Sequence, residues 1–236
     1  MQAVLLRVGI DSGSGGIQGP LFGDGSFELI PVPDIHDIDE RTYGNTPGRY
    51  GRALIDYFPL RLHARLRNQS MHVDPEFETY TYGDPGPTKA GLTRLEKGDM
   101  LIFYCGLQGY DRKFEPALYI AGYFEIEHVA KAGTLSADEL SEFSNNAHVC
   151  QKAILQKQRD KLLLIRGTKN SRLLSRARCI SGMGSDRDGK PLKVLSEEML
   201  TMFGPLGGRN SLQRSNPRWI TAPFVEGAAG FVRTLP

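Results

Sequence analysis

The chain has 236 residues, of which 40% are hydrophobic and 24% are charged, with a formal net charge of +2. This composition excludes a disordered chain, and the length suits a single domain, residues 1–236, with a sizeable core. Such a small net charge does not by itself demand a nucleic-acid partner.

The longest apolar runs are shorter than the roughly 18–20 residues that span a membrane, and the N-terminus carries no export signal pattern. Three widely spaced cysteines, Cys105, Cys150 and Cys179, do not form a disulfide framework or a cysteine-based zinc motif. We therefore expect a cytoplasmic protein without membrane contact.

The first third of the chain combines an apolar run with a glycine-rich loop. The run Ala3–Ile10 predicts a buried strand, and Asp24-Gly25 predicts a tight turn into a second strand over 26–32. Carboxylate and hydroxyl side chains at the mouth of a strand often contact a ligand, although an Asx-turn closing the loop is the alternative. From this loop we predict one catalytic residue, Asp11, and the ligand-binding residues Ser12, Ser14, Gly15 and Gly16.

The centre of the chain predicts helices and a long hairpin. Residues 34–48 and 83–91 have the composition of loops, and residues 49–67 predict helical pieces broken at Pro59. The apolar stretches 100–105 and 117–129 predict two antiparallel strands.

The last third predicts short elements. Ser136 and Glu139 form a capping box that starts a helix, and residues 162–165 predict a strand. Ser171 resembles the N-cap of a helix through Arg178, and a helix beginning at Ser196 should end before Gly204-Pro205. The expected fold class is α+β, with either a mixed β-sheet or a β-barrel and flanking helices.

A second polar group lies around His72 and Asp74. In a strand, His-x-Asp places both side chains on one face, where they can hold a divalent metal or orient a base. The spacing matches no zinc motif, and a polar turn at Asp74-Pro75 is the alternative. His148 is a further candidate because imidazoles act in acid–base chemistry, although a histidine beside a helix is often structural. We predict catalytic roles for His72, Asp74 and His148 and ligand-binding roles for Asp84, Tyr104 and Asn146; no cofactor is required, and a divalent metal is compatible.

Basic residues gather in 152–161 and 166–178. A basic face is the electrostatic signature of binding to phosphate backbones, and an ordinary solvated surface is the alternative. Arg218-Trp219 lies in a basic, polar stretch that suits contact with a phosphate or a base, or a loop pinned by one buried tryptophan. The predicted nucleic-acid contacts are Lys169, Arg172, Arg176, Arg178, Arg218 and Trp219.

The opening stretch, with Met71–Phe77, Gly98–Tyr104 and Asn146–His148 in this order and spacing, resembles the nucleotide modification associated domain family, third type. The resemblance covers most of the chain. It implies a standalone protein of phages, bacteria or archaea, encoded near DNA-modification or restriction functions, and it specifies no reaction.

Residues 98–129 are also similar to the PUA-like superfamily, in particular its EVE, ASCH and YTH group. That similarity rests on Gly98-Asp99 before one strand and a glycine, Gly122, within the next. It implies a mixed β-barrel with flanking helices, a fold in which many members bind RNA or modified DNA bases. A generic α+β sheet is the alternative.

Two other functions have partial matches. Gly9–Ser14 resembles the first phosphate loop of the actin and sugar-kinase superfamily, which needs a second such loop, and Asp84-Pro85-Gly86 is the nearest candidate. A nuclease would need Pro33-Asp34 together with Asp111–Lys113 or Asp188–Lys190 on a strand. Both of the latter lie in expected loops, where metal-holding geometry would fail.

Together these patterns predict a protein that recognises nucleic acid or a modified base, linked to DNA modification or restriction. The basic segment would neutralise the phosphate backbone while a base or nucleotide enters a polar pocket. The alternative is an enzyme that acts on nucleotides or modified bases through an Asp/His site. The oligomeric state is left open.

Overall fold

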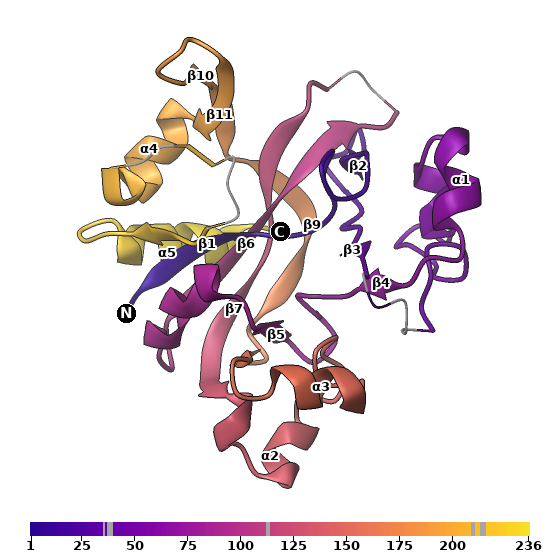
Figure 1. Cartoon of the computed structure of the whole chain (residues 1–236). Coiled ribbons are helices and arrows are strands. Elements are labelled where there is room, and N and C mark those ends of the chain that lie inside the picture. Colours follow the sequence, from indigo (N-terminus) through magenta and orange to yellow (C-terminus); the bar gives the residue numbers. More distant parts are fainter. Residues whose placement is uncertain (35, 37–39, 112–113, 209–210, 213–215) are drawn as a thin grey trace.

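A computed structural model (Figure 1) describes residues 1–34, 36, 40–111, 114–208, 211–212 and 216–236. Its centre is the hairpin of β6 (Met100–Gly109) and β7 (Ala117–Lys131), which confirms the two antiparallel strands expected there. Side chains on both faces of β6 are buried from Met100 to Leu107, as expected of a strand covered on both sides.

Around this hairpin lies one mixed sheet of eight strands in the order β12-β1-β6-β7-β8-β5, with β2 beside β6 and β9 beside β7. β1 and β2 run parallel to β6, and the other pairs are antiparallel. The added strands are β1 (Ala3–Arg7), β2 (Gly19–Leu21), β5 (Thr81–Asp84), β8 (Leu163–Gly167), β9 (Arg172–Cys179) and β12 (Arg218–Ile220).

The expected α+β class with a mixed sheet is confirmed, and the barrel alternative is not. In the part of the chain that the structure describes, the path of paired strands ends at β12 and at β5 and does not close. A barrel requires these two edges to pair with each other.

The chain leaves the sheet after β1 and returns at β2. The Val8 amide still donates to the Tyr104 carbonyl at 2.9 Å, but Gly9 takes a φ of +73° and the Ile10 amide turns to the Ile30 carbonyl at 2.8 Å. Pairing with β6 resumes at Gly19. The first strand is therefore shorter than expected, and the glycine-rich loop projects from the sheet between two strands that share one neighbour.

Most of the expected helical pieces are confirmed. Pro59 separates two of them, Ser136 and Glu139 form the capping box, and the helix after Ser196 ends at Gly204, whose φ is +67°. The helices are η1 (Leu54–Tyr57), α1 (Leu60–Leu66), η2 (Pro87–Arg94), η3 (Ala132–Thr134), α2 (Ala137–Ser141), α3 (Lys152–Gln158), α4 (Glu197–Phe203), η4 (Leu206–Gly208) and α5 (Val225–Thr234).

Among the described residues, each helix is too short or too polar to cross a membrane. Two small sheets complete the fold: β10 (Ser181–Ser185) with β11 (Pro191–Leu195), and β3 (Val32–Pro33) with β4 (Met71–His72). In Figure 1 the first pair stands beside α4, and the second lies between the main sheet and α1.

Two expected elements are wrong, and the loop expected over 83–91 instead holds the end of β5 and the first part of η2. The helix over 171–178 is instead β9, because pairing with β7 outweighs the local cap signal. The Ser171 hydroxyl accepts the Glu125 amide at 3.1 Å, across the sheet. The strand over 26–32 is reduced to a single bridge between Phe27 and Leu21, and β3 follows it. The turn before it is confirmed, with Gly25 at a φ of +86°.

Gly122 of β7 has no room for a side chain. A Cβ there would lie 2.6 Å from the Arg172 carbonyl oxygen and 2.8 Å from the Phe77 ring. We expect Gly122→Ala to lower the free energy of unfolding by about 1–3 kcal/mol through overpacking. The matched change Gly230→Ala, in α5 with no atom within 4 Å of its Cβ, should raise it by about 0.5–1 kcal/mol. Urea unfolding of both variants tests the packing, and equal shifts would contradict it.

Candidate functional site

A polar cavity of about 320 Å³ lies where the chain leaves β1, beside β4 and β5. Segments far apart in the sequence line it: the loop after β1, the end of β4, the end of β5, η2 and the chain before α3. It brings together six of the predicted site residues: Asp11, Ser14, His72, Asp74, Asp84 and His148.

The Asp74 carboxylate is the most buried charged group of this cavity, with only 4% of its side chain exposed. It accepts the Gly83 amide at 3.1 and 3.2 Å and the Asn146 side-chain amide at 3.2 Å. Burial raises the pKa of Asp74 well above its usual range, although both donors favour the charged form. A cation close to Asp74 would offset this cost of burial.

Two imidazoles face Asp74. Nε2 of His148 lies 3.7 Å and Nε2 of His72 lies 4.0 Å from Oδ2 of Asp74, and the ring centroids are 4.6 Å apart. Both distances to the carboxylate are too long for hydrogen bonds. One nitrogen or oxygen from each of the three residues lies within 4.8 Å of the other two. Two histidines and one carboxylate form a recurrent ligand set for zinc and iron.

The orientation of His148 is fixed from behind by α3. Its Nδ1 lies 2.8 Å from Oε1 of Gln158, and because an amide oxygen only accepts, we assign the proton to Nδ1. Burial lowers the pKa of His148, and burial followed by the neighbouring His148 lowers the pKa of His72 to about 4. At neutral pH, Nε2 of His148 then carries no proton and faces Oδ2 of Asp74, an arrangement that a metal ion or a proton on the raised-pKa carboxyl would resolve.

Gly83 and Asn146 hold this group together. A Cβ on Gly83 would lie 2.8 Å from Oδ1 of Asn146 and 2.9 Å from Cδ2 of His148, so the close approach requires glycine. Asn146 is fully buried, and its Oδ1 accepts the His148 amide at 3.0 Å. Although predicted to bind a ligand, Asn146 lies behind Asp74 and positions it.

Asp11 organises its own loop. Its Oδ1 accepts the amides of Gly13 and Ser14, both at 2.8 Å, and its carbonyl accepts those of Gly15 and Gly16 at 3.0 and 3.2 Å. Burial acts to raise the pKa of Asp11, but the bonds from Gly13 and Ser14 to its carboxylate and the adjacent Arg7 outweigh it and lower the pKa. The loop amides therefore point at Asp11, as in the Asx-turn alternative, and do not form an open phosphate cradle.

Arg7 and Lys89 are two cationic residues of the cavity that the sequence analysis missed. Arg7 pairs with Asp11 at 3.2 Å, and Lys89 pairs with Asp84 at 2.8 Å. Asp84 also accepts the Gly86 amide at 2.6 Å. No recognised sequence motif marks either ion pair. The i,i+4 spacing of Arg7 and Asp11 was the one feature of the sequence that could have indicated a contact.

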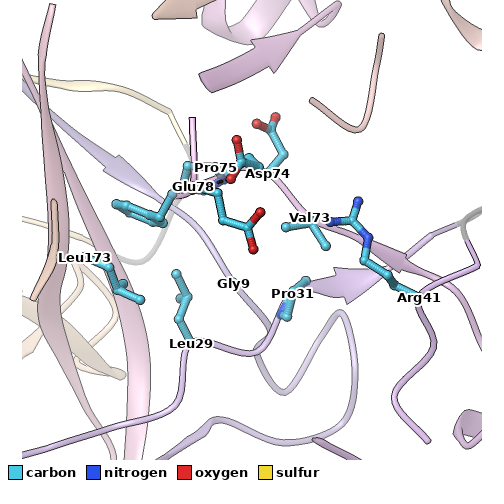
Figure 2. Close-up of a pocket in the computed structure, with 11 residues that line it drawn as sticks. Gly9, Leu29, Pro31, Arg41, Val73, Asp74, Pro75, Glu78 and Leu173 are labelled. Carbon is cyan, nitrogen blue, oxygen red and sulfur yellow. Dashed lines mark hydrogen bonds between the residues drawn. The ribbon is translucent and has the colours of Figure 1, made fainter. Parts of the chain in front are cut away.

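Other cavities adjoin the polar one. A more apolar cavity of about 290 Å³ shares His72 and His148 with it and is also lined by Ile154 and Gln158 of α3. A cavity of about 210 Å³ shares Asp74 with it; in Figure 2, the Asp74 carboxylate points away from the apolar wall of that cavity. A third neighbouring cavity, of about 380 Å³, is lined by Ser12, Gly13, Ser14, Gly15, Gly16 and Arg65, among others.

Tyr104, predicted to bind a ligand, lies in the core. It is fully buried, and its hydroxyl donates to the Leu212 carbonyl at 3.0 Å. Burial raises the pKa of Tyr104 to about 12. The structure thus places Tyr104 away from the polar cavity, where it anchors the segment before β12.

Several predicted nucleic-acid contacts already have partners within the chain. Arg172 donates to the Tyr123 hydroxyl at 2.9 Å, and Arg178 pairs with Glu198. Arg218 is buried in β12. The guanidinium of Arg94 lies over the Trp219 ring, 4.4 Å from its centroid. Lys169 and Arg176 are exposed members of the predicted set, and Arg176 lies close enough to Asp24 to contribute to the lowered pKa of that carboxyl.

The two partial matches from the sequence lack the geometry they require. The phosphate loop of the actin and sugar-kinase superfamily joins two strands of a hairpin, whereas β1 and β2 both pair with β6. Asp188–Lys190 lies in the turn between β10 and β11. Arg112 and Lys113 of the other nuclease match lie outside the described residues.

Residues 2–224 match the sequence family described as nucleotide modification associated domain 3. The chain belongs to this family. The match confirms the first resemblance seen in the sequence and includes every residue of the polar cavity, while the PUA-like similarity stays a prediction. No curated protein and no solved structure matches the chain.

The assigned proton of His148 can be observed directly. We expect long-range ¹H–¹⁵N NMR spectra of the metal-free protein at pH 7 to show His148 protonated on Nδ1, because Gln158 accepts there. Gln158→Leu should remove this preference, whereas Gln156→Leu, at an exposed position of the same helix, should keep it. A proton on Nε2 in the unaltered protein would contradict the assignment.

Proposed function

We propose that the protein is an enzyme that acts on nucleotides or modified bases, with a divalent metal held by His72, Asp74 and His148. The observation that carries the proposal is the contact between Nε2 of His148 and the Asp74 carboxylate. Nε2 of His148, which carries no proton when Nδ1 is protonated, lies 3.7 Å from Oδ2 of Asp74 in a nearly buried position, where an uncompensated carboxylate is costly.

The charges around the cavity support a cation at this point. Of the described residues that line it, two are cationic and three are aspartates. Arg7 pairs with Asp11 and Lys89 with Asp84, so the charge of Asp74 is the one left over. A divalent ion would compensate it, and three protein ligands leave coordination positions open for substrate or water.

Such a metal, when bound, supplies a Lewis acid for a phosphoryl or carbonyl oxygen and lowers the pKa of water. The residues of the chain then have separate roles. Gly83 and Asn146 orient the carboxylate of Asp74, and Gln158 keeps Nε2 of His148 unprotonated, as supporting residues of metal sites do. The family's link to nucleotide modification supports nucleotides or bases as substrates.

Metal binding tests the proposal first. We expect titration calorimetry with Zn²⁺ or Mn²⁺ to give one site per chain, and Asp74→Asn to weaken it by about a hundredfold or more, because the ligand set loses its only charge. Asp138→Asn, on the exposed part of α2, is the matched control and should bind as the unaltered protein does.

Turnover is tested with the same proteins after loading with Zn²⁺, Mn²⁺ or Fe²⁺. Deoxynucleotides and oligonucleotides carrying hydroxymethylated or glycosylated cytosine are the substrates to screen. Product that forms with the unaltered protein and with Asp138→Asn, but not with Asp74→Asn, supports the enzyme. Stoichiometric metal binding by Asp74→Asn with unchanged affinity would overturn the proposed site.

Recognition of nucleic acid without turnover is the second candidate, and α3 favours it. This helix exposes Lys152 and Lys157 and also carries Ile154 and Gln158, which line the apolar cavity beside the histidines. A strand could contact the lysines while one base enters. A role in DNA modification or restriction, and a cytoplasmic location, stay predictions from the sequence.

The salt dependence of oligonucleotide affinity tests whether α3 contacts the phosphate backbone. For the double variant Lys152→Gln/Lys157→Gln, the slope of log K against log salt for a single-stranded oligonucleotide should become shallower by about 1–1.5. Lys190→Gln, in the turn between β10 and β11, is the control. An unchanged slope in the double variant, measured by fluorescence anisotropy, would exclude α3 as the contact surface.

A further inference from the structure

Arg7 and Lys89 line the polar cavity together with the three proposed metal ligands. We propose that these two cations form an anion subsite that receives a phosphate group of the ligand beside the metal position. This inference rests on the proposed function and names the chemical group that the site recognises.

Lys89 is held in place with donors to spare. Its ammonium lies 2.8 Å from Oδ2 of Asp84 and 5.6 Å from the centre of the Tyr82 ring. Asp84 is itself fixed, since it accepts the Gly86 amide and, at 3.2 Å, the Tyr82 hydroxyl. A lysine ammonium has three N–H donors, and Asp84 occupies one of them. Lys89 can therefore bind an anion without breaking its ion pair.

Arg7, which lines the same cavity, is fixed in a comparable way. It is the last residue of β1, and its guanidinium lies 3.2 Å from Oδ2 of Asp11. The amides of Gly13 and Ser14 occupy the other carboxylate oxygen. Both cations are thus positioned by aspartates that the backbone already holds, and such preorganised charges suit recognition of a phosphate.

The sum of charges makes phosphate binding depend on the metal. With the two ion pairs neutral, the remaining charge of the cavity is that of Asp74 in its ionised form, which would repel an anion. A divalent ion changes the sum from about −1 to about +1, so metal and phosphate should each strengthen the binding of the other. If the two salt bridges were purely structural, metal binding and phosphate binding would not strengthen each other.

The phosphate could belong to a free nucleotide or to a nucleic-acid strand. The polar cavity, at about 320 Å³, is at the lower end of the range for small-ligand pockets. The apolar cavity across His72 and His148 offers a surface for a base. Both sources present the same group, and the probes of the experiment separate them.

The test uses calorimetry with inorganic phosphate, deoxycytidine 5′-monophosphate and a short single-stranded oligodeoxynucleotide, each with and without saturating Mn²⁺. We expect Lys89→Gln to weaken phosphate and nucleotide binding by roughly tenfold or more, because a charge-assisted hydrogen bond is lost. The Kd for Mn²⁺ alone should change much less, and Lys89→Arg should restore part of the anion affinity. Lys161→Gln, at an exposed position outside the polar cavity, is the control.

The outcomes separate this inference from the proposed function. Mn²⁺ binding with phosphate affinity that is unchanged in Lys89→Gln overturns the subsite and leaves the metal site standing. If Mn²⁺ does not bind, the proposed metal site is wrong. The subsite then stands only if phosphate still binds to the unaltered protein and binds more weakly to Lys89→Gln. The subsite is also overturned if phosphate does not bind to the unaltered protein either with or without Mn²⁺. Binding of the mononucleotide points to free nucleotides, and binding of the oligonucleotide alone points to a strand.

Discussion

The buried carboxylate of Asp74 is the constraint on which the rest of the site depends. A charge with 4% of its side chain exposed is tolerated only where donors and a compensating charge surround it. The amides of Gly83 and Asn146 provide the donors, and they also explain why position 83 has no side chain and why Asn146 is completely buried. The two imidazoles complete the surroundings without donating to Asp74. What is missing from this set is positive charge, and that is why a cation is the simplest completion of the site.

The sheet creates the place where these groups meet. β1 and β2 share β6 as a neighbour, so the chain between them must bulge out of the sheet after Gly9. On the opposite edge, β8 pairs with β5 and directs the end of β5 toward the same region. The cavity is therefore lined by the ends of strands and the segments that follow them, while most residues of β1 and β5 behind it are buried. A rigid sheet with the site on its connecting segments allows polar groups to converge without entering the core.

The sequence predicted the long elements well and the site in part. The hairpin of β6 and β7 and the capped helices follow from strong local signals, apolar runs and the Ser136 capping box. The supposed helix at 171–178 failed because its pairing with β7 is a long-range contact that no local pattern reveals. In the same way, the polar residue types of the cavity are visible in the sequence, but the supporting contact from Gln158 to His148 depends on how α3 packs. Chemistry-bearing residues can be found from local sequence, and their partners come from the fold.

The three aspartates of the cavity differ in what surrounds them, and this difference assigns their roles. Asp11 and Asp84 each accept backbone amides and face a cation, so their charges are fully compensated within the chain. The bonds that the Asp11 carboxylate accepts and the adjacent Arg7 lower its pKa, so Asp11 is a poor general base. The effect of Asp11 and Asp84 is instead to fix Arg7 and Lys89 at the cavity. Asp74 accepts amide donors and faces two imidazoles, while the nearby Lys89 is paired with Asp84. Burial outweighs the effect of Lys89 and raises the pKa of Asp74. Identical side chains thus separate into two that hold cations of the protein and one for which we propose a cation from outside it, and the proposed metal and phosphate positions both lie in the polar cavity.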